Sequence, residues 1–433
     1  MIGIIGAGTS GLMLGYLLQK KGIPYKIIEA SNRVGGYIQT EIQGDYILEK
    51  GPNSILVDQE MLQWLYDLEL KSEILFADNA SQNRYIYKNG KYRKLPSKPI
   101  DFLLNSFFSI SAKLRILKEQ SIAPQSLANE TLFSFIERRF GQEVANYVLN
   151  PFVSGIYAGD PKELFVEHTF PQLIEYEQKY GSIIKAMKAN KDTLERRKSV
   201  NFENGLQTLP KKLAELVNII YNNIVEKISF KNNKIFVNSD REDYFFDKLV
   251  FCTPASATAE MLRTFDQSFA NLLEQINYPP LCVVHTAFKK KDLKHSLNGF
   301  GVLHPKVENR YAAGTLWASS IFEKRCPKDE VLLSSFVGGT QYVEHTHFKE
   351  EEILAKTIAE MQQIYEIKEQ PVFSQTVFWN KSIPQYDKQI LPVWKKIPEL
   401  EAQNIFFCAN WVGGISIADR FKNAKNLSEI LSK

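Results

Sequence analysis

Cysteine is scarce in this sequence, and no two cysteines stand close together. Four occur among the 433 residues, with no CxxC pair, and they are Cys252, Cys282, Cys326 and Cys408. Such spacing neither frames a small disulfide-stabilised domain nor resembles a zinc site. We therefore expect free thiols, no metal site and a cytoplasmic location.

Long apolar runs and a strong charge of one sign are also missing. No window of about 18 continuously apolar residues occurs, so we expect no membrane-spanning helix. The chain begins MIGIIGAG without a basic stretch, so we expect no secretory signal. The net charge of only +4 argues against a dedicated nucleic-acid-binding protein. With 44% apolar and 24% charged residues, the chain has the composition of an ordinary folded protein.

The length and the local patterns predict an α/β protein of more than one domain. A single core stops growing at roughly 250 to 300 residues, and this chain has 433. Residues 2–29 have the pattern of a strand, a glycine turn, a helix and a second strand, with Gly22 ending the helix. Helical periodicity dominates residues 96–204, and short strands follow from Ile224 to Cys252. Further predicted elements are strands at 281–288 and 331–337 and a helix at 350–365.

The glycine-rich segment after the first predicted strand is a dinucleotide-binding motif. Residues 6–11 fit GxGxxG between a strand and a helix, and Glu29 ends the next strand. Gly6 permits the tight turn, Gly8 lets the backbone approach a pyrophosphate, and Gly11 allows close helix packing. The helix N-terminus offers unpaired N–H groups to the phosphates, and Glu29 is suited to accept hydrogen bonds from a ribose.

The segment that follows distinguishes FAD from NAD. Arg33, Gly35 and Gly36, and then the ExGPxS pattern that ends at Ser54, have a spacing that resembles the flavin amine oxidase superfamily. Similar matches follow at residues 204–209, 247–254 and 404–419. The resemblance implies non-covalently bound FAD in a Rossmann-type domain of the flavin amine oxidase type. It also implies a mixed-sheet substrate domain and a helical insertion.

The resemblance also divides the chain and assigns cofactor residues. It implies a discontinuous FAD-binding domain at 1–75, 205–262 and 398–433, a substrate domain at 76–90 and 263–397, and a helical domain at 91–204. The expected cofactor-binding residues are Gly6, Ala7, Gly8, Thr9, Ser10, Gly11, Glu29, Ala30, Arg33, Gly35, Gly36, Gly51, Pro52, Asn53, Ser54, Val225, Thr253, Trp411, Gly414, Ile415 and Ile417. Ala409 stands where relatives usually carry glycine.

Within that superfamily, the chain resembles the oxygen-dependent protoporphyrinogen oxidases. The most discriminating segment is NPFVSGIYAGDP at residues 150–161, which the amine oxidases proper lack. The resemblance implies a heme-pathway enzyme that oxidises a porphyrinogen, with six electrons passing to FAD as three hydrides and then to O₂. Two alternatives stay open, which are a coproporphyrinogen III oxidase and another FAD-dependent oxidoreductase of the amine oxidase type.

The resemblance implies five substrate-binding residues, which are Arg84, Asn53, Gly155, Leu303 and Phe322. Arg84 is expected to bind a propionate, with an exposed strand cation as the alternative. Leu303 and Phe322 are expected to clamp the macrocycle, with core packing as the alternative. Asn53 is a neutral amide and a poor base, so we assign it no proton-transfer role and name no certain catalytic residue. Because Arg84 is the single matched cation, a substrate with two propionates is favoured.

The helical segment raises the question of membrane contact. Residues 100–117 carry apolar and aromatic side chains between charged ones, and residues 185–198 are rich in Lys and Arg. These patterns suit either a helix at a bilayer surface or an ordinary core helix with a solvated face. The family resemblance implies peripheral attachment to the inner face of the cell membrane and a homodimer.

Overall fold

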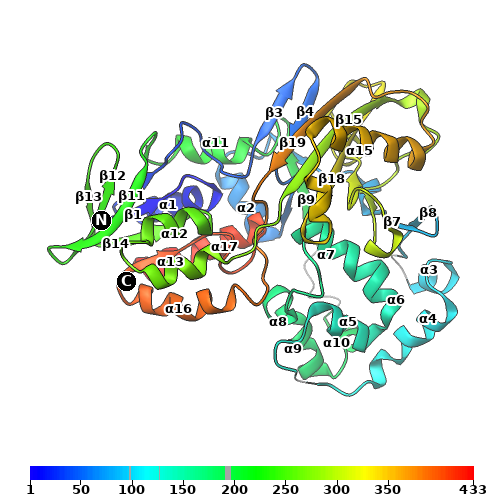
Figure 1. Ribbon diagram of the computed structural model, residues 1–433, viewed down its shortest axis with the longest axis horizontal. Coiled ribbons are helices and arrows are strands. Elements are labelled where there is room, and N and C mark those ends of the chain that lie inside the picture. The colour runs from blue at the N-terminus through cyan, green and yellow to red at the C-terminus, as the bar shows by residue number, and fades with distance from the viewer. Residues whose placement is uncertain (97–98, 126, 191–196) are drawn as a thin grey trace.

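The computed structural model describes residues 1–433 except 97–98, 126 and 191–196, and it leaves the side chains of 99, 100 and 103 undescribed. Figure 1 shows three regions: a nucleotide-binding part that holds both termini, a large sheet with a covering helix, and a group of short helices below that sheet. Lys191, Asp192, Glu195 and Arg196 of the basic segment lie outside the described residues.

A five-stranded parallel sheet forms the centre of the nucleotide-binding part. The order is β10-β2-β1-β14-β20, and each neighbouring pair is parallel. Gly22, with φ +69°, follows the first helix as predicted. The strands are β1 Ile2–Ile5, β2 Tyr25–Ile28, β10 Ile219–Ile220, β14 Lys248–Phe251 and β20 Ile405–Phe407, and the helices are α1 Thr9–Lys20, α2 Gln59–Asp67, α11 Thr208–Glu215 and α17 Ile417–Leu431. α1 and α17 pack together against the sheet, so the two ends of the chain share one core.

The predicted strands after Ile224 divide between two sheets. β11 Val225–Lys231, β12 Lys234–Ser239 and β13 Tyr244–Phe246 form an antiparallel meander, whose first turn has Asn232 and Asn233 at positive φ. The fourth strand leaves the meander and enters the parallel sheet as β14. α12 Ala255–Leu262, α13 Gln267–Glu274 and α16 Leu391–Glu401 pack around a second core beside it.

A seven-stranded sheet forms the second region, and it is mixed as predicted. Its order is β19-β15-β18-β17-β16-β7-β8, in which β16 and β7 are parallel and the other pairs antiparallel. The predicted strands and helix at 281–288, 331–337 and 350–365 are present as β15, β18 and α15. The bounds are β7 Arg84–Lys88, β8 Lys91–Lys94, β15 Leu281–Lys289, β16 Gly301–Leu303, β17 Gly314–Leu316, β18 Glu330–Gly338, β19 Phe373–Trp379, α14 Ala318–Ile321 and α15 Glu350–Tyr365.

The third region is helical and contains a buried ionic cluster. Arg139 is fully buried and pairs with Glu119 and Glu177, which lie on two other segments of this region. Such a cluster ties the short helices together, since each buried charge needs its partner. Among the described residues, we find no helix with the length and apolarity needed to cross a bilayer. The helices are α3 Pro99–Leu104, α4 Ile110–Leu117, α5 Leu132–Phe140, α6 Gln142–Val144, α7 Asn150–Tyr157, α8 Val166–Thr169, α9 Pro171–Tyr180 and α10 Ile183–Ala189.

The end of the predicted helical segment departs from the helical pattern. Lys198–Phe202 forms strand β9, which pairs with β5 Ile55–Val57 and β6 Ile74–Phe76. The helical prediction was wrong here because these strands lie more than a hundred residues earlier, where local periodicity cannot reveal them. The hairpin of β3 Thr40–Gln43 and β4 Tyr46–Glu49 completes the strands. The predicted domain limits stay a prediction.

Candidate active site

The glycine motif forms a tight loop between β1 and α1. Gly6 has φ +101°, a conformation that glycine adopts without steric cost. A Cβ on Gly11 would lie 2.0 Å from the Gly6 carbonyl oxygen, so the helix can approach the turn only without a side chain there. Gly8 caps α1 without a side-chain hydrogen bond, so the N–H groups of the first turn, which begins at Thr9 and Ser10, are open to an anion.

The outer face of this loop is bare backbone, which is what a pyrophosphate needs. A Cβ placed on Gly8 would meet only the Cα of Gly36, at 4.0 Å, and Gly8 pairs with Gly35 in an isolated bridge. Arg33 is exposed beside the loop, and its Nη1 donates to the Gly36 carbonyl at 3.0 Å. These residues therefore fit the diphosphate of a dinucleotide cofactor, with a cation beside it.

Glu29 lies directly after β2 and fixes the loop. Its Oε2 accepts from the Ala7 N–H at 2.7 Å, and its Oε1 accepts from the Ser31 N–H at 2.9 Å. A carboxylate has further lone pairs, so Glu29 can still accept from a ribose hydroxyl. Ala30 is exposed beside it, and Val225 is buried at the start of β11, two residues after Asn223, whose N–H donates to the Glu29 carbonyl.

The carboxyl ends of β14 and β20 carry the second group of predicted cofactor residues. Trp411 is fully buried, and its indole N–H donates to the Thr253 carbonyl at 3.1 Å. Gly414 has φ +108°, and its N–H donates to the Tyr386 hydroxyl at 2.7 Å. Ile415 and Ile417 are half-buried where α17 begins.

Arg420 holds this second turn in shape and was missed in the sequence. It is buried on α17 and donates to the carbonyls of Ala409, Val412 and Gly414. Because the carbonyls point inward to Arg420, the turn is fixed by a side chain that the sequence places in an ordinary helix. Ala409, where glycine was expected, is accommodated with its carbonyl in this cluster.

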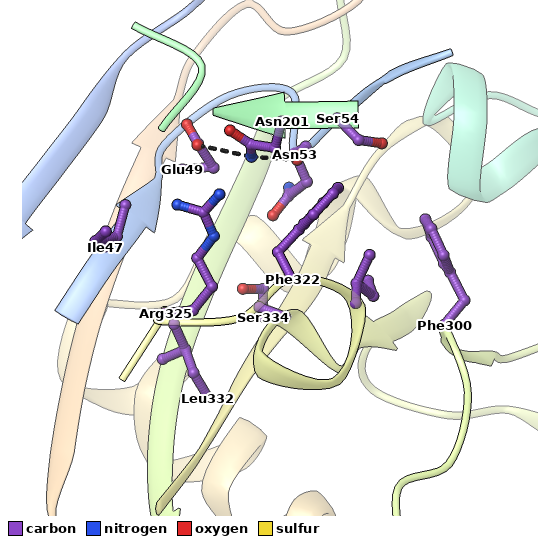
Figure 2. A pocket seen from close by; sticks show the side chains of 12 residues that line it. Ile47, Glu49, Asn53, Ser54, Asn201, Phe300, Phe322, Arg325, Leu332 and Ser334 are labelled. Carbon is purple, nitrogen blue, oxygen red and sulfur yellow. Dashed lines mark hydrogen bonds between the residues drawn. The ribbon is translucent and has the colours of Figure 1, made fainter. Parts of the chain in front are cut away.

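The segment Gly51–Ser54 leads into a pocket between the nucleotide-binding part and the seven-stranded sheet. Asn53 and Ser54 line it with Phe300, Phe322 and Arg325. Figure 2 shows these side chains together with Glu49 and Asn201, which come from β4 and β9. The full lining is Ile47, Glu49, Asn53, Ser54, Asn201, Phe300, Ala318, Ile321, Phe322, Arg325, Leu332 and Ser334.

Glu49 organises the wall of this pocket. Its Oε1 accepts from Asn201 Nδ2 at 3.0 Å and from the Leu206 N–H at 2.8 Å, and its Oε2 accepts from Thr40 Oγ1 at 2.7 Å. Asn201 Nδ2 also donates to the Asn53 carbonyl at 2.9 Å. Burial raises the pKa of Glu49 despite these donors. The carboxyl group therefore positions the backbone of Asn53.

Arg84 contacts an aromatic ring that lines the pocket. It begins β7, and its guanidinium carbon lies 3.6 Å from the centroid of Phe300, which lines the pocket. Partial burial lowers the pKa of Arg84 to about 10, so the group stays charged at neutral pH, and the side chain as a whole remains exposed. An exposed cation held against a ring that lines the pocket is suited to bind a carboxylate.

Gly155 and Leu303 form a contact between α7 and β16. A Cβ on Gly155 would lie 2.9 Å from Leu303 Cδ2, so the helix and the strand meet where Gly155 has no side chain. Neither residue is part of the pocket lining described above, whereas Asn53 and Phe322 are. The structure thus places two of the five predicted substrate residues, Asn53 and Phe322, in the pocket lining, and a third, Arg84, against the lining residue Phe300.

The pocket lining combines two aromatic rings, the amides of Asn53 and Asn201 and one cation, Arg325. Among the described residues no group of His, Cys, Asp and Glu is arranged to hold a metal. Sequence reasoning missed Glu49, Asn201 and Arg325 as pocket residues. The only available signal was the position of Glu49 in the ExGPxS pattern.

Comparison with known proteins agrees with this geometry. The family model described as flavin-containing amine oxidoreductase matches residues 9–418. Protoporphyrinogen oxidase 2 of Arabidopsis thaliana is 31% identical over 460 residues, covering 96% of this chain and 90% of the relative. Coproporphyrinogen III oxidase of Bacillus subtilis (strain 168) is 27% identical over 411 residues, covering 88% and 87%.

Solved structures support the same fold. A crystal structure from Exiguobacterium sp. 255-15 has a TM-score of 0.83 at 20% identity, covering 99% of this chain and 98% of that chain. Putrescine oxidase bound to putrescine has a TM-score of 0.69 at 14% identity, covering 100% and 99%. The glycine loop, the resemblance of the whole chain and the family match agree, so this FAD-dependent oxidoreductase belongs to the flavin-containing amine oxidoreductase family.

Proposed function

We propose that this protein oxidises protoporphyrinogen IX to protoporphyrin IX in heme biosynthesis, with O₂ as the final electron acceptor. The observation that carries the proposal is the pocket lined by Asn53 of the flavin motif and by the rings of Phe300 and Phe322, with the cation Arg84 held against Phe300. A porphyrinogen is a broad ring that carries carboxylates, and it needs apolar walls with a cation at the mouth. The extended similarity to protoporphyrinogen oxidase 2 of Arabidopsis thaliana supports this substrate class.

The residues of the chain bind and orient, while the cofactor performs the redox step. Bound FAD supplies a two-electron acceptor for hydride, used three times to remove six electrons. Phe300 and Phe322 offer aromatic faces to the macrocycle, and Arg84 holds a propionate. The amide of Asn53 lies at the pocket wall, where it positions the substrate without accepting a proton.

A second candidate is the oxidation of coproporphyrinogen III to coproporphyrin III. The similarity to coproporphyrinogen III oxidase of Bacillus subtilis favours it. That substrate carries four propionates instead of two, so it needs cations in addition to Arg84. A third reading, an FAD enzyme with an unrelated substrate, predicts a yellow protein that leaves both porphyrinogens unchanged.

The deciding experiment follows porphyrin fluorescence with each porphyrinogen under air. We expect the purified, FAD-loaded protein to convert protoporphyrinogen IX faster than the spontaneous rate, with consumption of O₂. Under anaerobic conditions the flavin absorbance should bleach on addition of the substrate, which separates substrate oxidation from the choice of acceptor. Full FAD loading with neither bleaching nor fluorescence would overturn the porphyrinogen proposal.

We further propose that the helical region contacts an anionic bilayer from the cytoplasmic side. α4 exposes Ile110, Leu114 and Leu117 at helical spacing, and Leu104 of α3 is 82% exposed nearby in sequence. Lys118 follows directly and is also exposed. Figure 1 shows α3 and α4 at the edge of the molecule remote from the nucleotide-binding part. Exposed apolar residues with a neighbouring cation match a surface that lies on anionic lipid.

A further inference from the structure

Arg325 is a buried cation whose hydrogen bonding is incomplete. It lies between α14 and β18 and is only 2% exposed. Its Nη2 donates to the Phe202 carbonyl at 2.8 Å, whereas its Nη1 has no hydrogen-bond partner among the described residues. Burying a charged group without partners costs several kcal/mol, so an orphaned guanidinium nitrogen points to an anion that belongs there.

Arg325 lines the pocket, and Figure 2 shows its guanidinium group turned toward Glu49 and Asn53. Glu49 forms no ion pair with it, and both Glu49 oxygens already accept hydrogen bonds from Thr40, Asn201 and Leu206. The charge of Glu49 acts on Arg325 from nearby, but within the part of the chain that the structure describes no carboxylate forms an ion pair with its guanidinium group.

Each of the two phenylalanine rings that line the pocket lies next to an arginine. The guanidinium carbon of Arg325 lies 5.5 Å from the centroid of Phe322, and that of Arg84 lies 3.6 Å from the centroid of Phe300. In Figure 2, Arg325 and Phe300 lie on opposite sides of Phe322. Arg84 is exposed and contacts the lining residue Phe300 from outside the lining, whereas Arg325 is buried within the lining, and we call its side the inner end of the pocket.

These positions suit carboxylates on opposite edges of one ligand. Protoporphyrinogen IX carries its two propionates on neighbouring pyrrole rings, so they occupy one edge of the macrocycle. Coproporphyrinogen III carries one propionate on each ring, so its opposite edge is also anionic. A guanidinium group at the inner end can bind such a carboxylate through charge-assisted hydrogen bonds.

We propose that Arg325 is a specificity-determining residue that binds a substrate carboxylate at the inner end of the pocket, so that the protein accepts coproporphyrinogen III in addition to protoporphyrinogen IX. The inference rests on the proposed porphyrinogen function and adds a second carboxylate anchor to Arg84.

The test compares both substrates and both products in the FAD-loaded protein. Kinetics give KM for each porphyrinogen, and fluorescence titration gives Kd for coproporphyrin III and protoporphyrin IX without turnover. We expect Arg325→Met to raise KM for coproporphyrinogen III and Kd for coproporphyrin III (the copro ligands) at least about 10-fold. The same constants for protoporphyrinogen IX and protoporphyrin IX (the proto ligands) should stay within about 2-fold of the wild-type values. Arg84→Met should weaken both kinds of ligand.

Two further variants guard against misfolding and general charge effects. Arg325→Lys keeps the charge, so it should fold and lose less copro affinity than Arg325→Met. Lys324→Met removes a charge from the adjacent residue, whose side chain is 71% exposed, and should change neither Kd. FAD content and melting temperature are measured for each variant.

Two results would overturn the role of Arg325. One is wild-type protein that does not bind coproporphyrin III. The other is an Arg325→Met variant in which both kinds of ligand weaken equally or in which stability alone falls, because Arg325 would then serve only as a buried structural residue that holds the Phe202 carbonyl. Failure of wild-type protein to oxidise protoporphyrinogen IX would instead overturn the proposed function, and the product titrations would still test Arg325.

Discussion

The guanidinium carbon of Arg84 lies 3.6 Å from the centroid of the Phe300 ring, and Phe300 lines the same pocket as Asn53. Arg84 begins β7 and Phe300 directly precedes β16, and these two strands pair in parallel with Arg84 opposite Gly301. The register of two strands from distant parts of the chain thus sets the cation beside the ring. This pairing links the seven-stranded sheet to the recognition of a carboxylate.

Arg84→Met should weaken the binding of substrate more than it slows turnover. The variant loses a charge-assisted contact of about 1.5 to 3 kcal/mol, which corresponds to a rise in KM of roughly 10-fold to 150-fold. Since the contact exists in both the ground state and the transition state, kcat should change little. Porphyrin fluorescence measures both constants. Lys91→Met, at an exposed position on β8, is the matched control, and an unchanged KM in Arg84→Met would remove Arg84 from the site.

Two glycines of the dinucleotide loop should respond differently to alanine. A Cβ on Gly11 would lie 2.0 Å from the Gly6 carbonyl oxygen, so Gly11→Ala should lower the melting temperature of the FAD-free protein. A Cβ on Gly8 meets no atom nearer than 4.0 Å, so Gly8→Ala should keep that melting temperature. Its methyl group would occupy the face open to the pyrophosphate, so FAD affinity should fall at least about 10-fold. Equal FAD affinity in Gly8→Ala would place the diphosphate elsewhere.

Glu49→Gln should change how stability depends on pH. Burial raises the pKa of Glu49 above its ordinary value, so its contribution to the free energy of unfolding is fully present below about pH 4.5 and is lost as pH rises through the folded-state pKa. Glutamine does not titrate, but its amide cannot accept from all three donors, which costs about 1 to 3 kcal/mol at acid pH. The variant should therefore be less stable than wild type at pH 4.5, with a gap that narrows as pH rises.

Denaturant unfolding at a series of pH values measures this gap. If the gap widened with rising pH, the pKa of Glu49 in the folded protein would have to lie below its ordinary value. Asn201→Ala provides a related control, because it removes one donor to Glu49 and leaves the carboxyl group itself in place. Its effect on stability should vary less with pH than that of Glu49→Gln.

Local patterns in the sequence were sufficient for the nucleotide-binding elements. Gly6, Gly8 and Gly11 are each required by the geometry of nearby residues. In the structure Gly6 has a positive φ, Gly8 leaves the outer face of the loop open, and a Cβ on Gly11 would clash with the backbone. The strands at 281–288 and 331–337 were equally clear, since both are nearly continuous apolar runs that pair along their whole length. Such features can be predicted because their physical cause lies in residues that are close in the sequence.

The pocket wall could not be predicted in this way. Glu49, Asn201 and Arg325 come from β4, β9 and the segment after α14, and they meet only because three separate sheets converge. Arg325 stands in the charged stretch FEKRCPKDE, which has the pattern of a solvated loop, yet it is buried. Asn201 lies in the strand that was predicted to be part of a helical segment. A local sequence pattern cannot predict that a residue is buried when its burial depends on pairing between strands that are distant in the sequence.

The exposed face of α4 should determine membrane affinity. Ile110 and Leu114 are 79% and 56% exposed. Moving each of these side chains from water into lipid is favourable by about 1.5 to 3 kcal/mol. The double variant Ile110→Asp/Leu114→Asp should therefore bind vesicles of anionic lipid at least about 10-fold more weakly, as measured by flotation. Ile42→Asp is the control, because Ile42 is also 56% exposed but lies on the β3 hairpin. If both variants bound vesicles as wild type does, α4 would not be the lipid contact, and loss of binding in Ile42→Asp alone would move the contact to the hairpin.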